Sequence, residues 1–501
     1  MQLPLNGGAF RARSIVGNAQ RRINLYPEMN REDSPWKFTH YQRPGRRVRA
    51  QGPNAAVRGL HRASNGNGYA AIGNNLYFVG ANWLLTLLGT FNVAGAGPVR
   101  MTDNGTTMLV VDGSGFGYSV NLATNAFAVV VDPTGTFQGA NTVDFLDTFT
   151  LWNLPGTRQF GSTISGALTF NALYTAGKVS YPDPLIALIV NRRQILLMGK
   201  NKSEIWYDAG GASFPFAELP GAYIEHGIFA QYSAAASDIN VYWLSQNLQG
   251  QGVVLRQRGY ETTVISNYAV SYAFEQAIAN GANLNDCVGY TYQIDGHVFY
   301  ALTSASGDFT WVYDESIGDP QLAWHQEAWT DPATRLLHRD RANCCAFLYG
   351  QNISGDWSNG ALYQMDPNYF MDDVAGVSDP ITCVAGFPRI ASAPLPNGQV
   401  GYVNGHRIQY NSLALDMEVG TGVLDPVSGL GGKVTLSISD DAGRTFNPAP
   451  IQTAGAPGEY LAQPLWRKLG MARNRVFEVS YAINGQAALN GAWVDCASLG
   501  N

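Results

Sequence analysis

The reaction that the residue types of this sequence could support is the hydrolysis of glycosidic bonds, which carboxylate side chains catalyse. That reaction needs two opposed carboxylates, one to protonate the leaving group and one to act as base or nucleophile. Candidates are Asp144, Asp147, Glu225 and Asp295. Their spacing in the sequence does not show which two would face each other. With 35 acidic residues after residue 62, carboxylates that resemble a pair are expected by chance. A carbohydrate-binding or glycan-hydrolysing protein is therefore the alternative interpretation rather than the leading one.

Two tryptophans, Trp324 and Trp329, could stack on sugars and would support that alternative. Such residues more often fill the core between the blades of a propeller. We therefore expect both rings to be structural.

Metal and cofactor chemistry is not expected. The histidines show neither H-x-H nor H-E-x-x-H spacing, and no P-loop, G-x-S-x-G or dinucleotide-binding fingerprint is present. The five cysteines contain no C-x-x-C pair and are expected to be reduced, buried thiols. No cofactor and no catalytic residue is therefore predicted. The residues considered were His226, His297, His325, His338, Cys287, Cys344, Cys345, Cys383 and Cys496.

The sequence SISDDAGRTF contains one Asp-box hairpin motif. Its members are Ser439, Asp441, Gly443, Thr445 and Phe446. In such a turn the Asp and Ser/Thr side chains accept hydrogen bonds from backbone N–H groups, the glycine supplies a positive φ, and the aromatic ring anchors the strand. Asp boxes occur in sialidase propellers, but there they are structural hairpins. We expect a structural turn here as well.

Short β-rich runs closed by Gly, Asn and Asp dominate the chain. Residues 187–211 show the pattern: apolar runs at 188–190, 195–198 and 205–207 are separated by turns, which is typical of antiparallel hairpins. Similar groups begin about 35–60 residues apart, as in propeller blades. Residues 57–390 are therefore predicted to form a β-propeller of six or seven blades, in which only residues 268–279 favour a helix. The groups lie at 68–80, 105–120, 141–152, 187–207, 238–266, 286–314 and 342–366.

The C-terminal part differs from this repeat. A proline-containing stretch at 385–400 is predicted to be a linker, and five or more runs of alternating apolar and polar residues follow it. Residues 391–501 are therefore predicted to form a β-sandwich. No run of about 18 apolar residues occurs, so no membrane-spanning segment is expected.

Charge is distributed unevenly along the chain. The net charge is −6, but residues 1–62 contain twelve Lys and Arg against three acidic residues, so the rest of the chain carries −15. Residues 1–50 show little apolar periodicity, and we predict that residues 1–56 form an extended basic N-terminal arm that docks on an acidic neighbour. A solvated leader without a partner is the alternative. The candidate docking residues are Arg21, Arg22, Arg43, Arg46, Arg47 and Arg49.

Four segments resemble one known family. They are INLYPE at residues 23–28, GPNAAVRGLHRA at 52–63, SEIWYDAGGASFPFAELPGAYIEHGI at 203–228 and LWRKLGMARNRVF at 465–477. Together they are similar to the packaged-DNA stabilisation proteins of short-tailed bacteriophages, also described as head-completion or tail-hub proteins. The third segment carries most of the resemblance, and the four span nearly the whole chain.

The resemblance implies a non-enzymatic virion protein that is made in the host cytoplasm and resides in the tail. It implies a homohexameric ring below the portal and its adaptor ring, in contact with distal tail proteins such as a needle, fibre or tailspike. Such a ring closes the head after packaging, stabilises the packaged DNA and later lets double-stranded DNA pass. The acidic body suits a conduit, because tight Lys and Arg contacts would trap the passing duplex.

Overall fold

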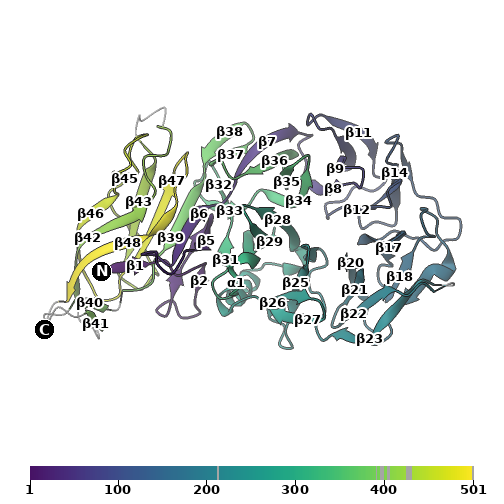
Figure 1. The fold of residues 1–501 in the computed structure, drawn as a ribbon, viewed down its shortest axis with the longest axis horizontal. Coiled ribbons are helices and arrows are strands. Elements are labelled where there is room, and N and C mark those ends of the chain that lie inside the picture. The colour runs from purple at the N-terminus through teal and green to yellow at the C-terminus, as the bar shows by residue number, and fades with distance from the viewer. Residues whose placement is uncertain (212–213, 391, 395–399, 403–406, 425–430, 499–501) are drawn as a thin grey trace.

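The computed structural model describes residues 1–211, 214–390, 392–394, 400–402, 407–424 and 431–498. Its strands form two bodies along the long axis of the molecule, a β-propeller and a β-sandwich (Figure 1). The predicted all-β architecture of propeller and C-terminal sandwich is therefore confirmed. The N-terminus lies at the sandwich and not at the propeller (Figure 1).

The described propeller strands fall into seven four-stranded antiparallel units. The first three are β8(Val57–Arg62), β9(Gly68–Ile72), β10(Asn75–Val79) and β11(Leu85–Thr90); β12(Arg100–Asp103), β13(Thr107–Val111), β14(Gly117–Asn121) and β15(Phe127–Val129); and β16(Val143–Leu146), β17(Phe149–Asn153), β18(Gln159–Ser162) and β19(Thr175–Gly177). The next two are β20(Leu185–Asn191), β21(Gln194–Gly199), β22(Ser203–Asp208) and β23(Phe216–Ile224); and β24(Ala235–Ala236), β25(Asn240–Gln246), β26(Gly252–Arg258) and β27(Glu261–Val264). The last two are β28(Val288–Ile294), β29(His297–Ser304), β30(Phe309–Asp314) and β31(Trp324–Gln326); and β34(Ala342–Leu348), β35(Gln351–Asp356), β36(Ala361–Asp366) and β7(Gly45–Gln51).

The units close into a ring through their first strands. Each first strand contacts the first strand of the next unit, and β34 of the last unit contacts β8 of the first. The last unit takes its fourth strand, β7, from the N-terminal part of the chain, where Gln364 of β36 pairs with Arg47. A strand from one end of the chain thus completes a blade built mainly from residues more than 290 positions away, which locks the ring.

Residues 187–211 form the hairpins expected from their sequence. In β20–β21, Asn191 pairs with Gln194 and encloses the turn residues Arg192 and Arg193, whose φ values are 50° and 61°. A two-residue turn with both φ values positive matches the twist of the flanking strands. Arginine rarely adopts such φ values, so the residue types at the turn do not explain its conformation. The pairing of apolar residues along β20–β21, with Leu188 opposite Leu197, fixes the register and therefore the two-residue turn.

The sandwich consists of two sheets. One has the order β46-β42-β48-β6-β5, with β1 on β48; the other continues the sixth propeller unit through β4 into β39, β47, β43 and β44, with β45 on β43. Leu413, Trp466 and Phe477 are buried between the sheets. The strands are β1(Gln2–Pro4), β4(Arg22–Ile23), β5(Leu25–Met29), β6(Phe38–Gln42), β39(Thr382–Gly386), β42(Ile408–Met417), β43(Lys433–Ser439), β44(Asn447–Pro448), β45(Gln452–Thr453), β46(Leu465–Ala472), β47(Val476–Ala482) and β48(Leu489–Ser498).

The remaining elements are short. The expected helix is present as α1(Tyr268–Ala279), capped by the Asn267 side chain, which accepts a hydrogen bond from the Val270 N–H. The others are β2(Phe10–Arg11), β3(Ala19–Gln20), β32(Ala328–Thr330), β33(Leu337–Arg339), β37(Met371–Val374), β38(Val377–Pro380), β40(Ser392–Pro394), β41(Val400–Tyr402) and the 3₁₀ turns η1(Ala172–Tyr174), η2(Leu284–Asp286) and η3(Glu315–Ile317).

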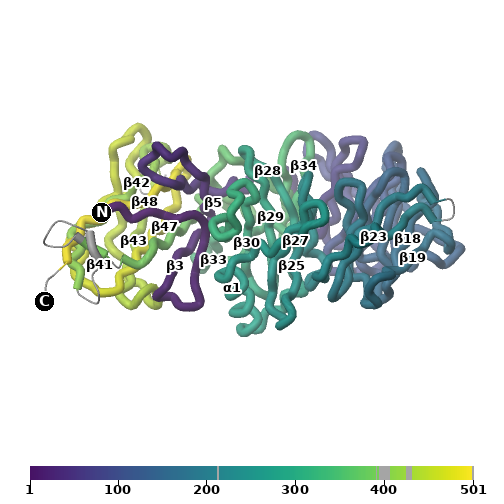
Figure 2. Tube along the Cα trace, turned by 60° about the horizontal axis from the view of Figure 1, so that its bottom comes forward, coloured from purple at the N-terminus to yellow at the C-terminus, as the bar shows by residue number. Residues whose placement is uncertain are grey.

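The N-terminal segment is built into both bodies. Figure 2 shows it running along the sandwich and into the propeller, and its strands β1, β4, β5, β6 and β7 pair with strands of both. Leu3, Leu5 and Leu25 are buried in the sandwich core, and Tyr26 packs in the sixth unit. Only the β2–β3 hairpin, which lies against α1, has the outlying position expected of an arm.

The predicted boundary between propeller and sandwich also differs from the structure. β39 lies before residue 390, the predicted end of the propeller, yet it pairs with β47 of the sandwich. Part of the predicted linker is therefore a sandwich strand. Residues 391, 395–399, 403–406, 425–430 and 499–501, which the sequence analysis assigned to the sandwich, lie outside the described residues.

Candidate interaction site

Two arginines of the N-terminal segment lie in a buried ion network. The Arg43 guanidinium donates to both carboxylate oxygens of Asp372, at 3.0 and 2.6 Å. Arg46 donates through Nη2 to Glu327 Oε2 at 2.9 Å and to Asp340 Oδ1 at 2.7 Å. All five side chains are at most 6% exposed. The network therefore joins β7 and the chain before it to β37 and to the segment between the sixth and seventh propeller units, residues 327–341.

Burial and charge act against each other in this network. Burial lowers the pKa of Arg46, but Asp340 and Glu327 raise it well above its usual value. Burial raises the pKa of the Glu327 carboxyl, and Asp340 raises it further. The pKa of Asp340 is lowered despite burial, because Arg46 and Arg43 favour its charged form. Both arginines are thus held as cations by carboxylates from distant parts of the chain.

Arg22 is fully buried without a carboxylate partner among the described residues. Its guanidinium donates to the carbonyl oxygens of Arg21 at 2.7 Å and Gly386 at 2.6 Å, and to Gln20 Oε1 at 3.2 Å. Burial lowers its pKa to about 9. Its contacts join β4 to β39, within the sheet that runs from the propeller into the sandwich.

These positions correct part of the docking hypothesis. Arg22, Arg43 and Arg46 were assigned to an exposed arm, but their side chains are 0–1% exposed and cannot reach a neighbouring protein. The physical reason is that carboxylates and carbonyl groups from distant strands compensate the charges, so the arginines could be buried without a hydrophobic pattern.

The other three candidate docking residues lie nearer the surface. Arg21 pairs with Glu478 at 3.2 Å and is 37% exposed, and Arg47 is 48% exposed, with Asp366 at 3.6 Å and the Tyr369 ring below its guanidinium. Arg49 donates to the side chain of Gln364. Docking through these three residues stays a prediction.

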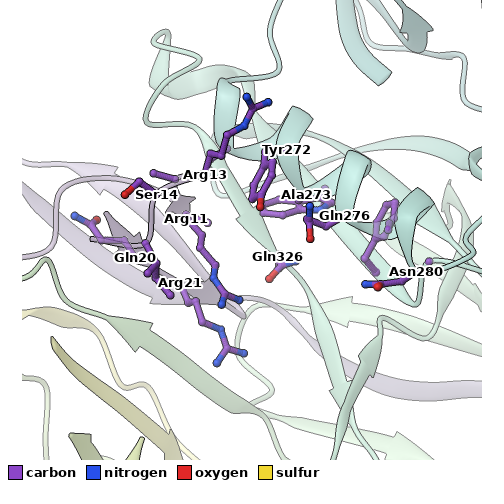
Figure 3. Close-up of a pocket in the computed structure, with 18 of the residues that line it drawn as sticks. Arg11, Arg13, Ser14, Gln20, Arg21, Tyr272, Ala273, Gln276, Asn280 and Gln326 are labelled. Carbon is purple, nitrogen blue, oxygen red and sulfur yellow. The ribbon is translucent and has the colours of Figure 1, made fainter. Parts of the chain in front are cut away.

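A groove of about 960 Å³ lies where the N-terminal segment, the propeller and the sandwich meet (Figure 3). One side carries the β2–β3 hairpin and the chain that follows it, and the other side carries α1 (Figure 3). The floor includes residues of β30 and β31, and one sandwich residue, Arg444, completes the lining. The polar and aromatic residues that line it are Arg11, Arg13, Ser14, Gln20, Arg21, Tyr272, Gln276, Asn280, Asp308, Phe309, Trp311, Gln326 and Arg444.

Four arginines line this groove, and two of them have carboxylate partners. Arg13 lies 3.4 Å from Glu275 of α1, with its guanidinium 5.5 Å from the centre of the Tyr272 ring, and Arg21 pairs with Glu478. Arg11 and Arg444 make no ion pair with any described residue. Sequence reasoning counted Arg11 and Arg13 only as part of a basic segment and missed Arg444, because nothing in the sequence places the Asp-box turn beside the N-terminus.

The Asp-box turn positions Arg444. Asp441 Oδ1 accepts hydrogen bonds from the backbone N–H groups of Arg444 and Thr445, each at 2.9 Å, and Oδ2 accepts from the Thr445 hydroxyl at 2.7 Å. Ser439 Oγ accepts from the Gly443 N–H, and Gly443 has a φ of 96°. The Ser439 hydroxyl donates to Asp441 Oδ1 at 2.6 Å and lowers the pKa of Asp441 most, and the Thr445 and Arg444 donors lower it further. The partly buried Phe446 ends the motif.

Comparisons with known proteins identify the family. Residues 1–370 match the family model described as Bacteriophage P22 Gp10, beta-propeller, and residues 398–497 match the model described as Bacteriophage P22 Gp10, beta-sandwich. The chain belongs to this family. It is accordingly a structural protein of the phage tail, and the resemblance stated from the four sequence segments is confirmed.

A search of curated proteins finds no match. Solved structures similar to the chain include the WD40 beta propeller domain of Doa1 (10% identity, 64% of this chain and 97% of that chain, TM-score 0.38). They also include the computationally designed Ika8 protein (10% identity, 64% of this chain and 99% of that chain, TM-score 0.39). A third is the extracellular domain of the putative hybrid two-component system BT4673 from B. thetaiotaomicron (9% identity, 73% of this chain and 46% of that chain, TM-score 0.44).

The carboxylates considered for glycan hydrolysis are engaged separately. Asp144 of β16 accepts the Val190 N–H at 2.6 Å, and burial raises its pKa to about 6. Asp147 pairs with Arg193 at 2.9 Å and Glu225 with Lys202 at 2.7 Å. Asp295 occupies the β28–β29 turn with a φ of 52°. Each of the four thus has its own place in a turn, a strand or a surface ion pair, and no hydrogen bond or ion pair among the described residues joins any two of them.

The aromatic and metal-ligand candidates also have structural surroundings. Trp324 is fully buried and donates through Nε1 to the Ile265 carbonyl at 2.8 Å, while Trp329 lies under the Arg341 guanidinium at 4.8 Å. His297 pairs with Asp314 and His338 with Asp308, while burial lowers the pKa of His325 to about 3. Within the described ranges, no cluster of His, Cys, Asp and Glu is suited to hold a metal ion. No described helix is long and apolar enough to cross a membrane.

Proposed function

We propose that this chain forms a homohexameric ring in the tail of a short-tailed phage, below the portal and its adaptor ring. The ring closes the head after packaging, stabilises the packaged DNA and later provides the conduit for its ejection. Its neighbours are the adaptor ring above and the distal tail proteins, a needle, fibre or tailspike, below. The chain is made in the host cytoplasm and acts without a cofactor or catalytic site.

The observation that carries this proposal is the pair of family matches, which together include both bodies of the chain. The path of the N-terminal segment through both the propeller and the sandwich also supports the proposed structural role. A subunit under pressure from packaged DNA has to transmit force between its domains, and here one continuous ten-stranded sheet links propeller and sandwich. The charge distribution is also consistent with a conduit, because residues 63–501 carry a net charge of −15.

The assembly is tested by native mass measurement of the purified protein, alone and with its portal-adaptor ring. A species of six times the 54.1 kDa chain mass, formed alone or on the adaptor, is the expected result. A chain that stays monomeric with the adaptor present would contradict the ring.

The conduit is tested by DNA binding of the full chain. We expect duplex DNA to bind with a dissociation constant no tighter than about 10⁻⁴ M at about 150 mM salt, the weak end of ordinary non-specific binding. Micromolar binding at that salt concentration would contradict a surface along which DNA slides.

A further inference from the structure

The groove between the β2–β3 hairpin and α1 presents cations that the described part of the chain does not neutralise. Arg11 lines it from the hairpin and Arg444 from the Asp-box turn, and both side chains are exposed. Arg13 is 74% exposed, and its contact with Glu275 at 3.4 Å is a loose one. Exposed pairs of this kind contribute little, so Arg13 can exchange its partner for another carboxylate.

The rest of the lining suits the backbone of a peptide. Amide side chains lie on the α1 side and on the floor, from Gln276, Asn280 and Gln326. Each amide offers both a donor and an acceptor, as an extended peptide backbone requires. The Tyr272 ring adds a flat apolar surface beside them.

The distribution of charge favours a peptide over a nucleic acid. Asp308 also lines the groove and Glu275 lies at its edge, so negative charge interrupts the row of arginines. A nucleic acid carries a phosphate at every nucleotide and cannot avoid these carboxylates. A peptide can place acidic side chains opposite the arginines and neutral ones opposite Asp308.

We propose that this groove binds an extended, carboxylate-bearing segment of a neighbouring virion protein. The segment would contact the N-terminal hairpin, the propeller helix and the sandwich at once, since the groove is lined by all three. Binding would therefore fasten the two bodies of the chain together at the point where the partner docks. The inference rests on the proposed structural role, and it names the chemistry by which a partner is held.

The test compares two double variants that change net charge equally. Arg11→Glu with Arg444→Glu reverses the two groove cations that form no ion pair with the described residues; among these residues the Arg444 side chain donates only to the Asp441 carbonyl, at 2.9 Å. Arg62→Glu with Arg467→Glu reverses two exposed cations outside its lining. The probes are fluorescein-labelled octaglutamate and fluorescein-labelled octathymidylate, titrated by fluorescence anisotropy at low salt. Thermal unfolding of both variants shows that they are folded, since all four side chains lie at the surface.

We expect the full-length wild-type chain to bind octaglutamate, and the groove variant to bind it at least about tenfold more weakly. The control variant should lose no more than about twofold, the effect of net charge alone. Equal losses in the two variants, or no binding by the wild type, would overturn the inference. Tighter binding of octathymidylate, lost in the groove variant, would overturn it in favour of a nucleic-acid site.

Failure of the inference and failure of the proposed function give different results. A chain that forms its ring with the adaptor but shows equal losses in both variants keeps its proposed role and loses this groove as a docking site. A chain whose groove variant alone loses octaglutamate binding, yet which forms no ring, keeps the groove chemistry and loses the proposed role.

Discussion

Arg46 and Arg47 are consecutive residues of β7 with opposite surroundings. Successive side chains of a strand point to opposite faces, so Arg46 reaches Glu327 and Asp340 in the interior while Arg47 is 48% exposed beside Asp366. An ion pair in the interior has to offset the cost of removing both charges from water, whereas one at the surface contributes little. The two arginines therefore form a matched pair for measuring what burial does.

Replacing Arg46 with leucine should destabilise the protein strongly. Arg46→Leu leaves Glu327 and Asp340 buried without their shared cation, and we expect the free energy of unfolding to fall by about 3–5 kcal/mol. Chemical denaturation of the full chain measures this change. Arg47→Leu is the control and should cost less than about 1 kcal/mol. Equal effects of the two substitutions would show that the Arg46 network is not a stabilising contact.

Asp144 should make the stability of the chain depend on pH. Burial raises its pKa to about 6, while His61 and Arg100, from neighbouring inner strands, and the Val190 and Phe145 N–H groups act in the other direction. The folded state therefore binds a proton that the unfolded state has released above its ordinary pKa of about 4. The stability contributed by this group is present below about pH 4 and is lost as the pH rises to about 6.

The measurement is the melting temperature of the wild type minus that of Asp144→Asn, taken from pH 4 to pH 7. We expect the difference to fall between pH 4 and about pH 6 and then to level off. Asp147→Asn, in the same β16–β17 hairpin, controls for the loss of one carboxylate. A difference that grows as the pH rises would mean that the fold stabilises the ionised form of Asp144.

At the scale of elements, the sequence predicted what is local. The hairpins, α1 and the sandwich follow from apolar alternation and turn residues within a few positions of one another. The N-terminal segment could not be predicted this way, because its partners are distant: Arg46 and Glu327 are 281 positions apart. In two of its strands, β4 and β7, the buried arginines Arg22 and Arg46 take the place of apolar residues. The groove was missed for the same reason, as it assembles from three distant segments.

Removing the N-terminal segment should therefore damage the whole fold. Deleting residues 1–51 removes β7 from the seventh propeller unit and Leu3, Leu5 and Leu25 from the sandwich core. We expect the truncated chain to unfold about 10 °C or more below the full chain, or not to fold at all. Thermal denaturation followed by circular dichroism measures this.

The control for that deletion is the outlying hairpin. Replacing residues 11–18 with two glycines removes the β2–β3 turn but leaves the five paired strands of the segment in place. This variant should melt within about 3 °C of the full chain. If the large deletion were equally harmless, the segment would be an independent arm after all.

At the scale of the molecule, Asn24 joins the two bodies. It is fully buried, and its Nδ2 donates to the Ala328 carbonyl at 2.9 Å and to the Thr382 carbonyl at 2.8 Å, while its Oδ1 accepts from Arg43 Nε at 2.9 Å. Ala328 follows the sixth propeller unit, and Thr382 lies on sandwich strand β39. Asn24 also has a φ of 59°, which asparagine tolerates better than most residues. It belongs to the INLYPE segment, so a family motif coincides with the junction of the domains.

Propeller and sandwich should consequently unfold together. The ten-stranded sheet crosses the junction without a break, and the N-terminal segment contributes core residues to both sides. We expect scanning calorimetry of the full chain to show one transition, although two bodies of this size ordinarily unfold as separate domains. Asn24→Ala removes the side-chain bonds to Ala328 and Thr382, and it leaves the buried Ala328 N–H and Arg43 Nε without the Asn24 oxygen that accepts from both. It should split the transition into two, because the junction then opens before either core melts.

The control is Asn30→Ala, which removes an asparagine whose bonds stay within the N-terminal segment, and it should keep the single transition. Two transitions in the wild-type chain would show that the shared sheet does not couple the two bodies.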